Sequence, residues 1–223
     1  MLRKDLVLCK TRNLLTEFMA PITAKADKPR QRFLRQAVGA ILISSSLIVT
    51  ELTHWINDDC SDMFYRLKRL LNHLVGPHGR LTAVVQAYRK TVAKHIQPDT
   101  PIVIDLTDLA KPRARKMKYL NLVHDGSEHT QVTGYWCVEV YARLKKKRIL
   151  PLALNAFGVD DPGVGSRNLQ IERTVTAMNK ALDGNGIYVA DRGFDGLNLY
   201  EMWFSLNCHF VAWQRAKPLC NYI

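Results

Sequence analysis

The sequence predicts an α/β protein, in which an all-helical N-terminal region precedes a mixed β-sheet with flanking helices. Three observations lead to this prediction. Residues 1–96 place apolar side chains mainly at helical spacing. Short runs of β-branched residues then begin at Pro101. The last part of the chain alternates such runs with helical segments, a pattern typical of sheets with crossover helices.

Length and charge set the first limits on function. The chain has 223 residues, which suffices for one large domain or two small ones, and carries a net charge of +12. Residues 1–100 hold 16 Lys and Arg against 8 Asp and Glu, a net charge of +8. This balance favours a polyanionic partner, either nucleic acid or an anionic membrane surface. A basic protein without such a partner is the alternative, and the later Lys and Arg clusters make nucleic acid the preferred interpretation.

The cysteines and the most apolar run argue against secreted and membrane proteins. The five cysteines are widely spaced and form no Cys-x-x-Cys or Cys/His metal pattern, so we expect reduced thiols in a cytosolic protein. The N-terminus lacks the features of a signal peptide. The segment Ala37–Thr50 is too short and too rich in Ser to span a bilayer. The cysteines are Cys9, Cys60, Cys137, Cys208 and Cys220.

The N-terminal region is predicted to begin with a helix over residues 1–20 that ends at Pro21, followed by a polar and basic loop. Two helices are then expected at Phe33–Ile43 and Leu47–Ile56, with a break at Ser44–Ser46. A helix, a short polar turn and a second helix form the outline of a helix-turn-helix, the DNA-binding motif. An ordinary antiparallel helix pair would give the same pattern.

Two further helices complete the N-terminal region. Asp58–Val75 begins with acidic residues, which suit the positive end of a helix dipole, and ends near Gly76. Its basic residues lie largely off the apolar stripe, on a face that is either solvated or in contact with phosphate. A helix over Leu81–Ile96 follows, and two prolines in Gln97–Pro101 make a stiff joint. We therefore predict a helical DNA-binding region over 1–97 and a second domain over 98–223.

The second domain is predicted to contain strand, strand, strand, helix, strand, helix and strand, in that order. The basic segment Lys111–Lys118 is expected to be a loop after the first strand, and Lys145–Arg148 a turn within a hairpin. We expect Asp195 to cap the second helix. The strands are expected at Ile102–Ile104, Val132–Leu144, Ile149–Phe157, Ile187–Ala190 and Cys208–Trp213, and the helices at Asn168–Leu182 and Gly196–Leu206.

Two Asp residues directly follow two of the predicted strands. Asp105 comes after Ile102–Ile104, and Asp191 comes after Ile187–Ala190. In a mixed sheet these strands can lie side by side, so that the two carboxylates face one another. Two close carboxylates cannot both stay ionised without help, and Mg²⁺ provides it through oxygen ligands. The alternative is a pair of structural Asp residues that hold loops, with Asp191 paired to Arg192 or another basic residue.

Basic segments accompany this acidic pair. Two Mg²⁺ ions about 3.5–4 Å apart at the acidic pair would stabilise the attacking and leaving oxygens of a phosphoryl displacement. Basic residues nearby would neutralise a nucleic-acid backbone, although they could also form solvated faces. The residues that we assign to DNA binding are Lys111, Arg113, Arg115, Lys116 and Lys118, together with Lys145, Lys146, Lys147 and Arg148.

Four segments in order resemble the DDE transposases of bacterial insertion sequences, in particular the insertion-sequence-four-like group. They are Ile104–Asp108, Gly134–Leu144 with Ile149–Leu152, Ala190–Asp195 and Cys208–Arg215. The resemblance covers about 101–217 and implies a ribonuclease-H-like catalytic domain, with Asp105 as first acid and Asp191 as second. Asp108 is the alternative candidate for the first acid, and it is expected to lie beyond the strand end. The resemblance also gives Arg192 a role in positioning phosphate.

The resemblance implies DNA cleavage and strand transfer with Mg²⁺ or Mn²⁺, two ions in a complete site, on double-stranded transposon ends and target DNA. A homodimer in the DNA complex and a cytoplasmic, nucleoid-associated location are expected, with no membrane. The third acid of the family is a Glu on a later helix, and no segment here matches it; Glu172 and Glu201 are expected on the surface. We therefore expect a C-terminally truncated catalytic domain with little or no strand-transfer activity. The alternatives are an inactive DNA-binding fragment that represses transposition, and an unrelated nuclease that uses Asp108 or Asp195.

Overall fold

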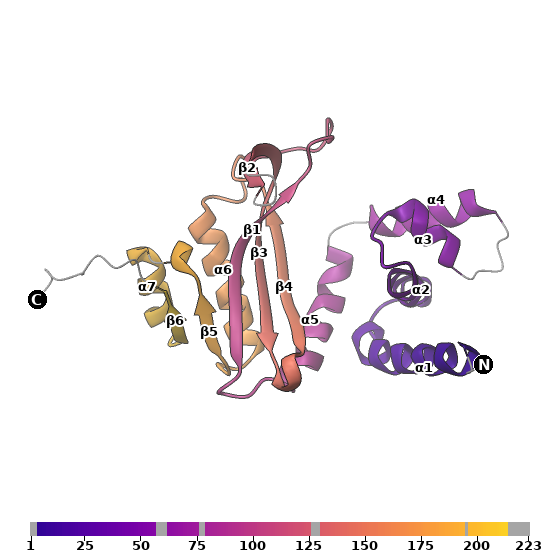
Figure 1. Cartoon of the computed structure of the whole chain (residues 1–223), viewed down its shortest axis with the longest axis horizontal. Coiled ribbons are helices and arrows are strands. Elements are labelled where there is room, and N and C mark those ends of the chain that lie inside the picture. Colours follow the sequence, from indigo (N-terminus) through magenta and orange to yellow (C-terminus); the bar gives the residue numbers. More distant parts are fainter. Residues whose placement is uncertain (1–3, 57–61, 76–78, 126–129, 195, 214–223) are drawn as a thin grey trace, which may run out of the picture. The chain divides into compact units, whose positions relative to one another are not determined.

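The computed structural model describes residues 4–56, 62–75, 79–125, 130–194 and 196–213. Its contacts divide the chain into two compact units, Met1–Thr91 and Val92–Ile223. Over the described residues the first unit is helical, and the second contains a six-stranded mixed sheet with two further α-helices (Figure 1). The α/β class and the order of helices before sheet are therefore confirmed.

The helical unit is held together by apolar contacts between α2, α3 and α4. Phe33 and Ala40 from α2, Leu52 and Ile56 at α3, and Leu70 from α4 form one buried cluster. Leu70 is only 3% exposed, whereas its neighbour Leu71 is 43% exposed. The helices are α1 (Lys4–Thr23), α2 (Lys28–Ser44), α3 (Val49–Trp55), α4 (Met63–Leu74) and α5 (Gly79–Ala93).

Side-chain caps set two helix starts that differ from the prediction. The α2 helix begins at Lys28, within the predicted loop, because Asp27 Oδ1 accepts the backbone N–H of Arg30 at 2.8 Å. Asp62 caps α4 in the same way and receives the N–H of Phe64 at 2.8 Å. The predicted start at Asp58 lies outside the described residues. The α1 helix also continues past Pro21 to Thr23, so the predicted end was wrong.

The α2 and α3 helices meet at 97° across a four-residue connection. An antiparallel pair is therefore excluded, and the angle falls in the range of helix-turn-helix motifs. Ser45, at φ 52°, ends α2 in the left-handed conformation. Among the described residues, no single helix is long and apolar enough to cross a membrane. The bent pair of α2 and α3 together has the length and composition of a broken span.

The sheet has the strand order β2-β3-β1-β5-β6, and β4 pairs with β3 outside this path (Figure 1). β1 runs antiparallel to β3 and parallel to β5, which in turn runs parallel to β6. β1 is therefore central in the sheet. The strands are β1 (Pro101–Ala110), β2 (Asn121–Asp125), β3 (Thr130–Arg143), β4 (Ile149–Phe157), β5 (Ile187–Ala190) and β6 (His209–Ala212).

Two helices, α6 (Arg167–Ala181) and α7 (Leu197–Ser205), cover the same face of the sheet. Asn155, which is paired with Val138, donates a hydrogen bond to Thr174 of α6 at 3.2 Å. Tyr188 contacts Trp203 of α7, with ring centroids 5.2 Å apart. The register places Tyr188 beside Ile102, on the face that also holds Val138. That face is the core of the unit, and its central side chains are fully buried.

Three local expectations for this unit need correction. β1 does not end at Ile104 but continues to Ala110, because β3 provides a partner for each residue as far as Gly134. The strand β2 was not expected, since its five residues lie in a polar segment. The α7 helix is capped by Gly196 without a side-chain hydrogen bond, so the predicted cap by Asp195 was wrong; Asp195 itself lies outside the described residues.

Candidate functional site

The parallel pairing of β1 with β5 brings two distant Asp residues together. Ile104 is paired with Ala190 at the end of the β5 ladder; Asp105 is the next residue of β1, and Asp191 directly follows β5. Neighbouring strands lie about 4.8 Å apart. The two Asp backbones therefore occupy adjacent positions, although β1 continues past Asp105 as a strand while the chain turns after Asp191.

Both Asp side chains are exposed, whereas Ile104 and Ala190 are buried on the face covered by α6 and α7. Successive side chains of a strand point to opposite faces, so Asp105 lies on the face away from these helices. The Oδ1 atom of Asp191 accepts the backbone N–H of Gly193 at 2.8 Å. This hydrogen bond fixes the carboxylate at the start of the short helix η2 (Arg192–Phe194).

A third carboxylate belongs to the same face. Glu139 of β3 is directly paired with Asp105 across the antiparallel ladder, so both side chains lie on one face. Burial raises the pKa of the Cys137 thiol to about 11, and the charge of Glu139 contributes to this shift, which places Glu139 beside Cys137. Glu139 leaves no signal of its own in the sequence, because it lies inside a strand and only the register relates it to Asp105.

The acidic residues suit a hard divalent cation by donor type, since Mg²⁺ is bound in proteins through one or two carboxylates together with substrate phosphate. Asp105 and Asp191 provide two such carboxylates from neighbouring strands. Within the described part of the chain, however, no group of three or more His, Cys, Asp or Glu side chains is close enough to hold a metal. A cation bound here would therefore need oxygen atoms from substrate or water in addition.

The other acidic candidates lie elsewhere. Asp108 is three residues beyond Asp105 on a regular strand and therefore points to the opposite face. There it is paired with Trp136, over whose ring the guanidinium of Arg167 lies at 4.9 Å. Glu172 and Glu201 are exposed on α6 and α7, as expected. Asp108 is thus no partner for Asp105 in binding one ion.

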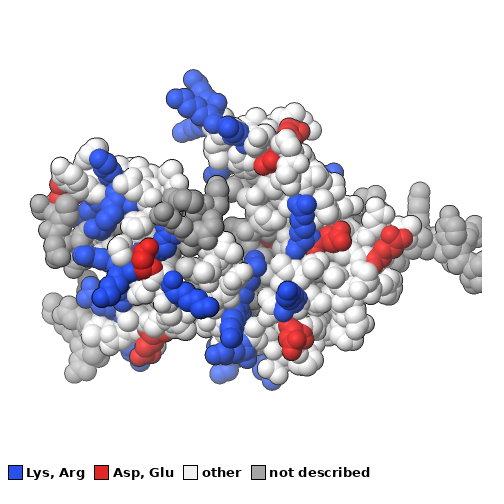
Figure 2. Space-filling view, turned by 180° about the vertical axis from the view of Figure 1, so that it is seen from behind, with Lys and Arg blue, Asp and Glu red and all other residues white. Residues whose placement is uncertain are grey.

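The two basic segments lie at opposite ends of the β1–β3 ribbon, with the acidic pair between them. The loop after β1 contains Lys111–Lys118, and η1 (Lys145–Lys147) connects β3 to β4 at the other end. Lys111 comes six positions after Asp105, and Lys145 comes six positions after Glu139, about 20 Å in each direction along extended chain. Figure 2 shows Lys and Arg gathered on a projection at one end of the sheet unit and again at its opposite end.

The exposure of the basic side chains agrees with a binding surface. All the assigned Lys and Arg residues of both segments are exposed except Lys111, which is half-buried. The strand register places neither basic segment next to Asp105 or Asp191. Neither segment is therefore positioned to hold the reacting phosphate itself. The side chain of Arg192, the remaining predicted phosphate contact, lies outside the described residues.

No family model matches the chain, and no curated protein matches it. Among solved structures, the piggyBac transposase in a synaptic complex with hairpin DNA is similar, with a TM-score of 0.46 and 12% sequence identity. The alignment covers 97% of this chain and 52% of the transposase chain, so the present chain spans about half the length of that protein.

Proposed function

We propose that this protein acts on double-stranded DNA as a metal-dependent phosphoryl-transfer enzyme, a DDE-type transposase of the insertion-sequence-four-like group. The observation that carries the proposal is the β1–β5 register, which pairs Ile104 with Ala190, so that Asp105 of β1 lies next to the residue that follows β5, Asp191. The four ordered sequence segments that resemble this family, and the +12 net charge, support it further. In a cell, such a protein would work at the DNA of the cytoplasm or nucleoid.

The residues have distinct roles in this proposal. Asp105 and Asp191 would hold Mg²⁺ or Mn²⁺, which when bound stabilises charge on the attacking and leaving oxygens of a phosphodiester. The hydrogen bond from Gly193 orients Asp191 before substrate arrives. The exposed basic segments at both ends of the β1–β3 ribbon would neutralise the DNA backbone on either side of the reacting phosphate.

A nicking assay on supercoiled plasmid with Mg²⁺ or Mn²⁺ tests the proposal. Because no segment matches the third acid of the family, we expect only weak metal-dependent nicking by the 223-residue chain, lost in Asp105→Asn and Asp191→Asn. Glu172→Gln, which removes an exposed carboxylate from α6, is the matched control and should retain activity. Equal nicking by all four proteins would refute the role of the two Asp residues. Glu139→Gln shows whether the third carboxylate of this face contributes.

A second candidate is a DNA-binding protein without cleavage activity that represses transposition by occupying transposon ends. One observation favours it: the described residues offer no group of three metal-ligating side chains. Salt-dependent binding to duplex DNA without nicking in either metal would support this candidate over the enzyme. Binding with nicking that depends on Asp105 would exclude it.

A further inference from the structure

The geometry points to the outer face of α4 as the surface that reads base pairs in the major groove of duplex DNA. Four residues, which we call the α4 face, form it: Tyr65, Lys68, Arg69 and Asn72. The inference rests on the proposed function only in taking DNA as the partner. It assigns sequence reading to α4 rather than to α3, the second helix of the predicted helix-turn-helix.

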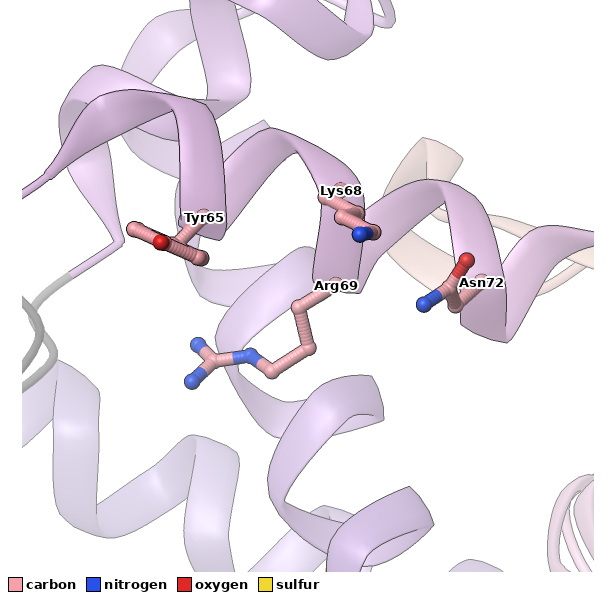
Figure 3. Close-up of a pocket in the computed structure, with 4 residues that line it drawn as sticks. All are labelled: Tyr65, Lys68, Arg69 and Asn72. Carbon is pink, nitrogen blue, oxygen red and sulfur yellow. The ribbon is translucent and has the colours of Figure 1, made fainter.

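The four residues lie on one side of a single helix. Their spacing of i, i+3, i+4 and i+7 places them along one stripe of an α-helix. Figure 3 shows all four side chains leaving α4 on the same side, where they border a hollow of about 350 Å³. Tyr65, Lys68 and Asn72 are exposed, and Arg69 is half-buried. The stripe is therefore open to a partner along about two turns of helix.

The opposite side of α4 is fixed to the rest of the helical unit. Leu70 is buried in the cluster shared with α2 and α3. The Nη1 atom of Arg66 donates hydrogen bonds to the carbonyl oxygens of Thr53 and Ile56, both at 3.3 Å. These carbonyls lie at the C-terminal end of α3, where a cation is favourable. The α4 face is thus presented on a rigid support, as a helix that enters a groove requires.

Positive charge concentrates where α4 meets α2. Arg69 donates a hydrogen bond to Gln36 of α2 at 3.1 Å. Burial lowers the pKa of Arg69, and the nearby positive charge of Arg32 lowers it further. Arg32 and Gln36 also line a second cavity of about 630 Å³, together with Arg12 and Arg35. A backbone phosphate at the edge of a groove would offset the repulsion between the Arg32 and Arg69 charges.

The residue types of the α4 face match the donor and acceptor pattern of base edges. Arg and Lys bind the O6 and N7 atoms of guanine, and Asn forms two hydrogen bonds with the N6 and N7 atoms of adenine. The 12 residues of α4 span about 18 Å, enough to lie in a major groove. The α3 helix has only seven residues and carries Glu51 in its first turn, which phosphate would repel.

The test measures binding of the full chain to a mixed-sequence 30-base-pair duplex by fluorescence anisotropy between 50 and 200 mM salt. Lys68→Ala and Arg69→Ala should each weaken binding roughly 5- to 100-fold and lower the salt slope by about 1. Lys25→Ala is the matched control, since Lys25 lies exposed in the turn between α1 and α2. Thermal unfolding by circular dichroism verifies that each variant is folded.

Selection from a random duplex library then tests base reading. Asn72→Ala should relax the preference at one base pair of the selected sequence while leaving the remaining positions unchanged. Wild-type chain that binds no duplex would overturn both the proposed function and this inference. Wild-type binding that Lys68→Ala and Arg69→Ala reduce no more than Lys25→Ala does would overturn the inference alone. A preference for hairpin RNA over duplex DNA would overturn it as well.

Discussion

The proposed proximity of the Asp105 and Asp191 carboxylates can be tested without any substrate. Two unit charges about 5 Å apart in water repel each other by about 0.8 kcal/mol, and adjacent strands place the two backbones about 4.8 Å apart. Changing either Asp to Asn should therefore raise the free energy of unfolding by about 0.8 kcal/mol, because it removes this repulsion. The free energy of unfolding of the double variant should rise by about 0.8 kcal/mol less than the sum of the two single increases, because the same repulsion is removed only once.

Urea unfolding followed by tryptophan fluorescence gives the four free energies of this cycle. In 1 M NaCl the Debye length is about 3 Å, so the coupling should disappear. Because Glu139 is paired with Asp105, Asp105→Asn also removes a like-charge pair between β1 and β3. It should therefore raise the free energy of unfolding somewhat more than Asp191→Asn does. Glu172→Gln serves as control and should change the free energy of unfolding by less than about 0.5 kcal/mol. Additive effects, within about 0.3 kcal/mol, would show that the two carboxylates are not neighbours.

Three further predictions concern the support of the site and the two cores. Gly186→Ala should lower the free energy of unfolding by about 1–3 kcal/mol, because Gly186 has φ +100° and a Cβ there would collide with Ile102 of β1. Gly184 has φ +71° but open space around it, so Gly184→Ala should lower the free energy of unfolding by only about 1 kcal/mol in the same urea titration. Leu70→Ala should cost about 2–4 kcal/mol in thermal unfolding of the helical unit because it empties a buried position, and the more exposed Leu71→Ala should cost less than about 1 kcal/mol; equal losses would contradict the packing described. Burial raises the pKa of the Cys137 thiol from 9.0 to about 11, so between these pH values the unfolded chain releases a proton that the folded chain keeps, and stability should fall as pH rises. Cys137→Ala should reduce that alkaline loss by about 1 kcal/mol at pH 10, measured against the same variant at pH 8.

Much of the fold could be predicted from local sequence patterns. The β4 and β5 strands have the predicted bounds, because β-branched and apolar residues there are enclosed by clear turn signals. The α6 helix was located to within one residue at each end. Helix starts at Asp27 and Asp62 were predicted less well, since capping depends on one side chain and leaves little trace in hydrophobic periodicity.

The candidate site was predictable in its residues but not in its arrangement. An apolar run followed by an acid marks Asp105 and Asp191 in the sequence, yet only the register of β1 with β5 makes them neighbours. Glu139 could not be found this way, because a strand pairing between residues 34 positions apart leaves no local signal. Lys68 and Arg69 of the α4 face were expected off the apolar stripe, whereas Tyr65 and Asn72 were not predicted, and the contact of Arg69 with Gln36 required the packing of α2.

The most direct test of the central claim is backbone cleavage by Fe²⁺, which can replace Mg²⁺ at a carboxylate site and generates hydroxyl radicals that cut nearby chain. With ascorbate and peroxide, the folded chain should be cut close to residues 105 and 191, on both β1 and β5. Excess Mg²⁺ and the Asp191→Asn substitution should each suppress both cuts together. Cuts elsewhere, or at only one of the two strands, would contradict the proposal that these two Asp residues bind one metal site.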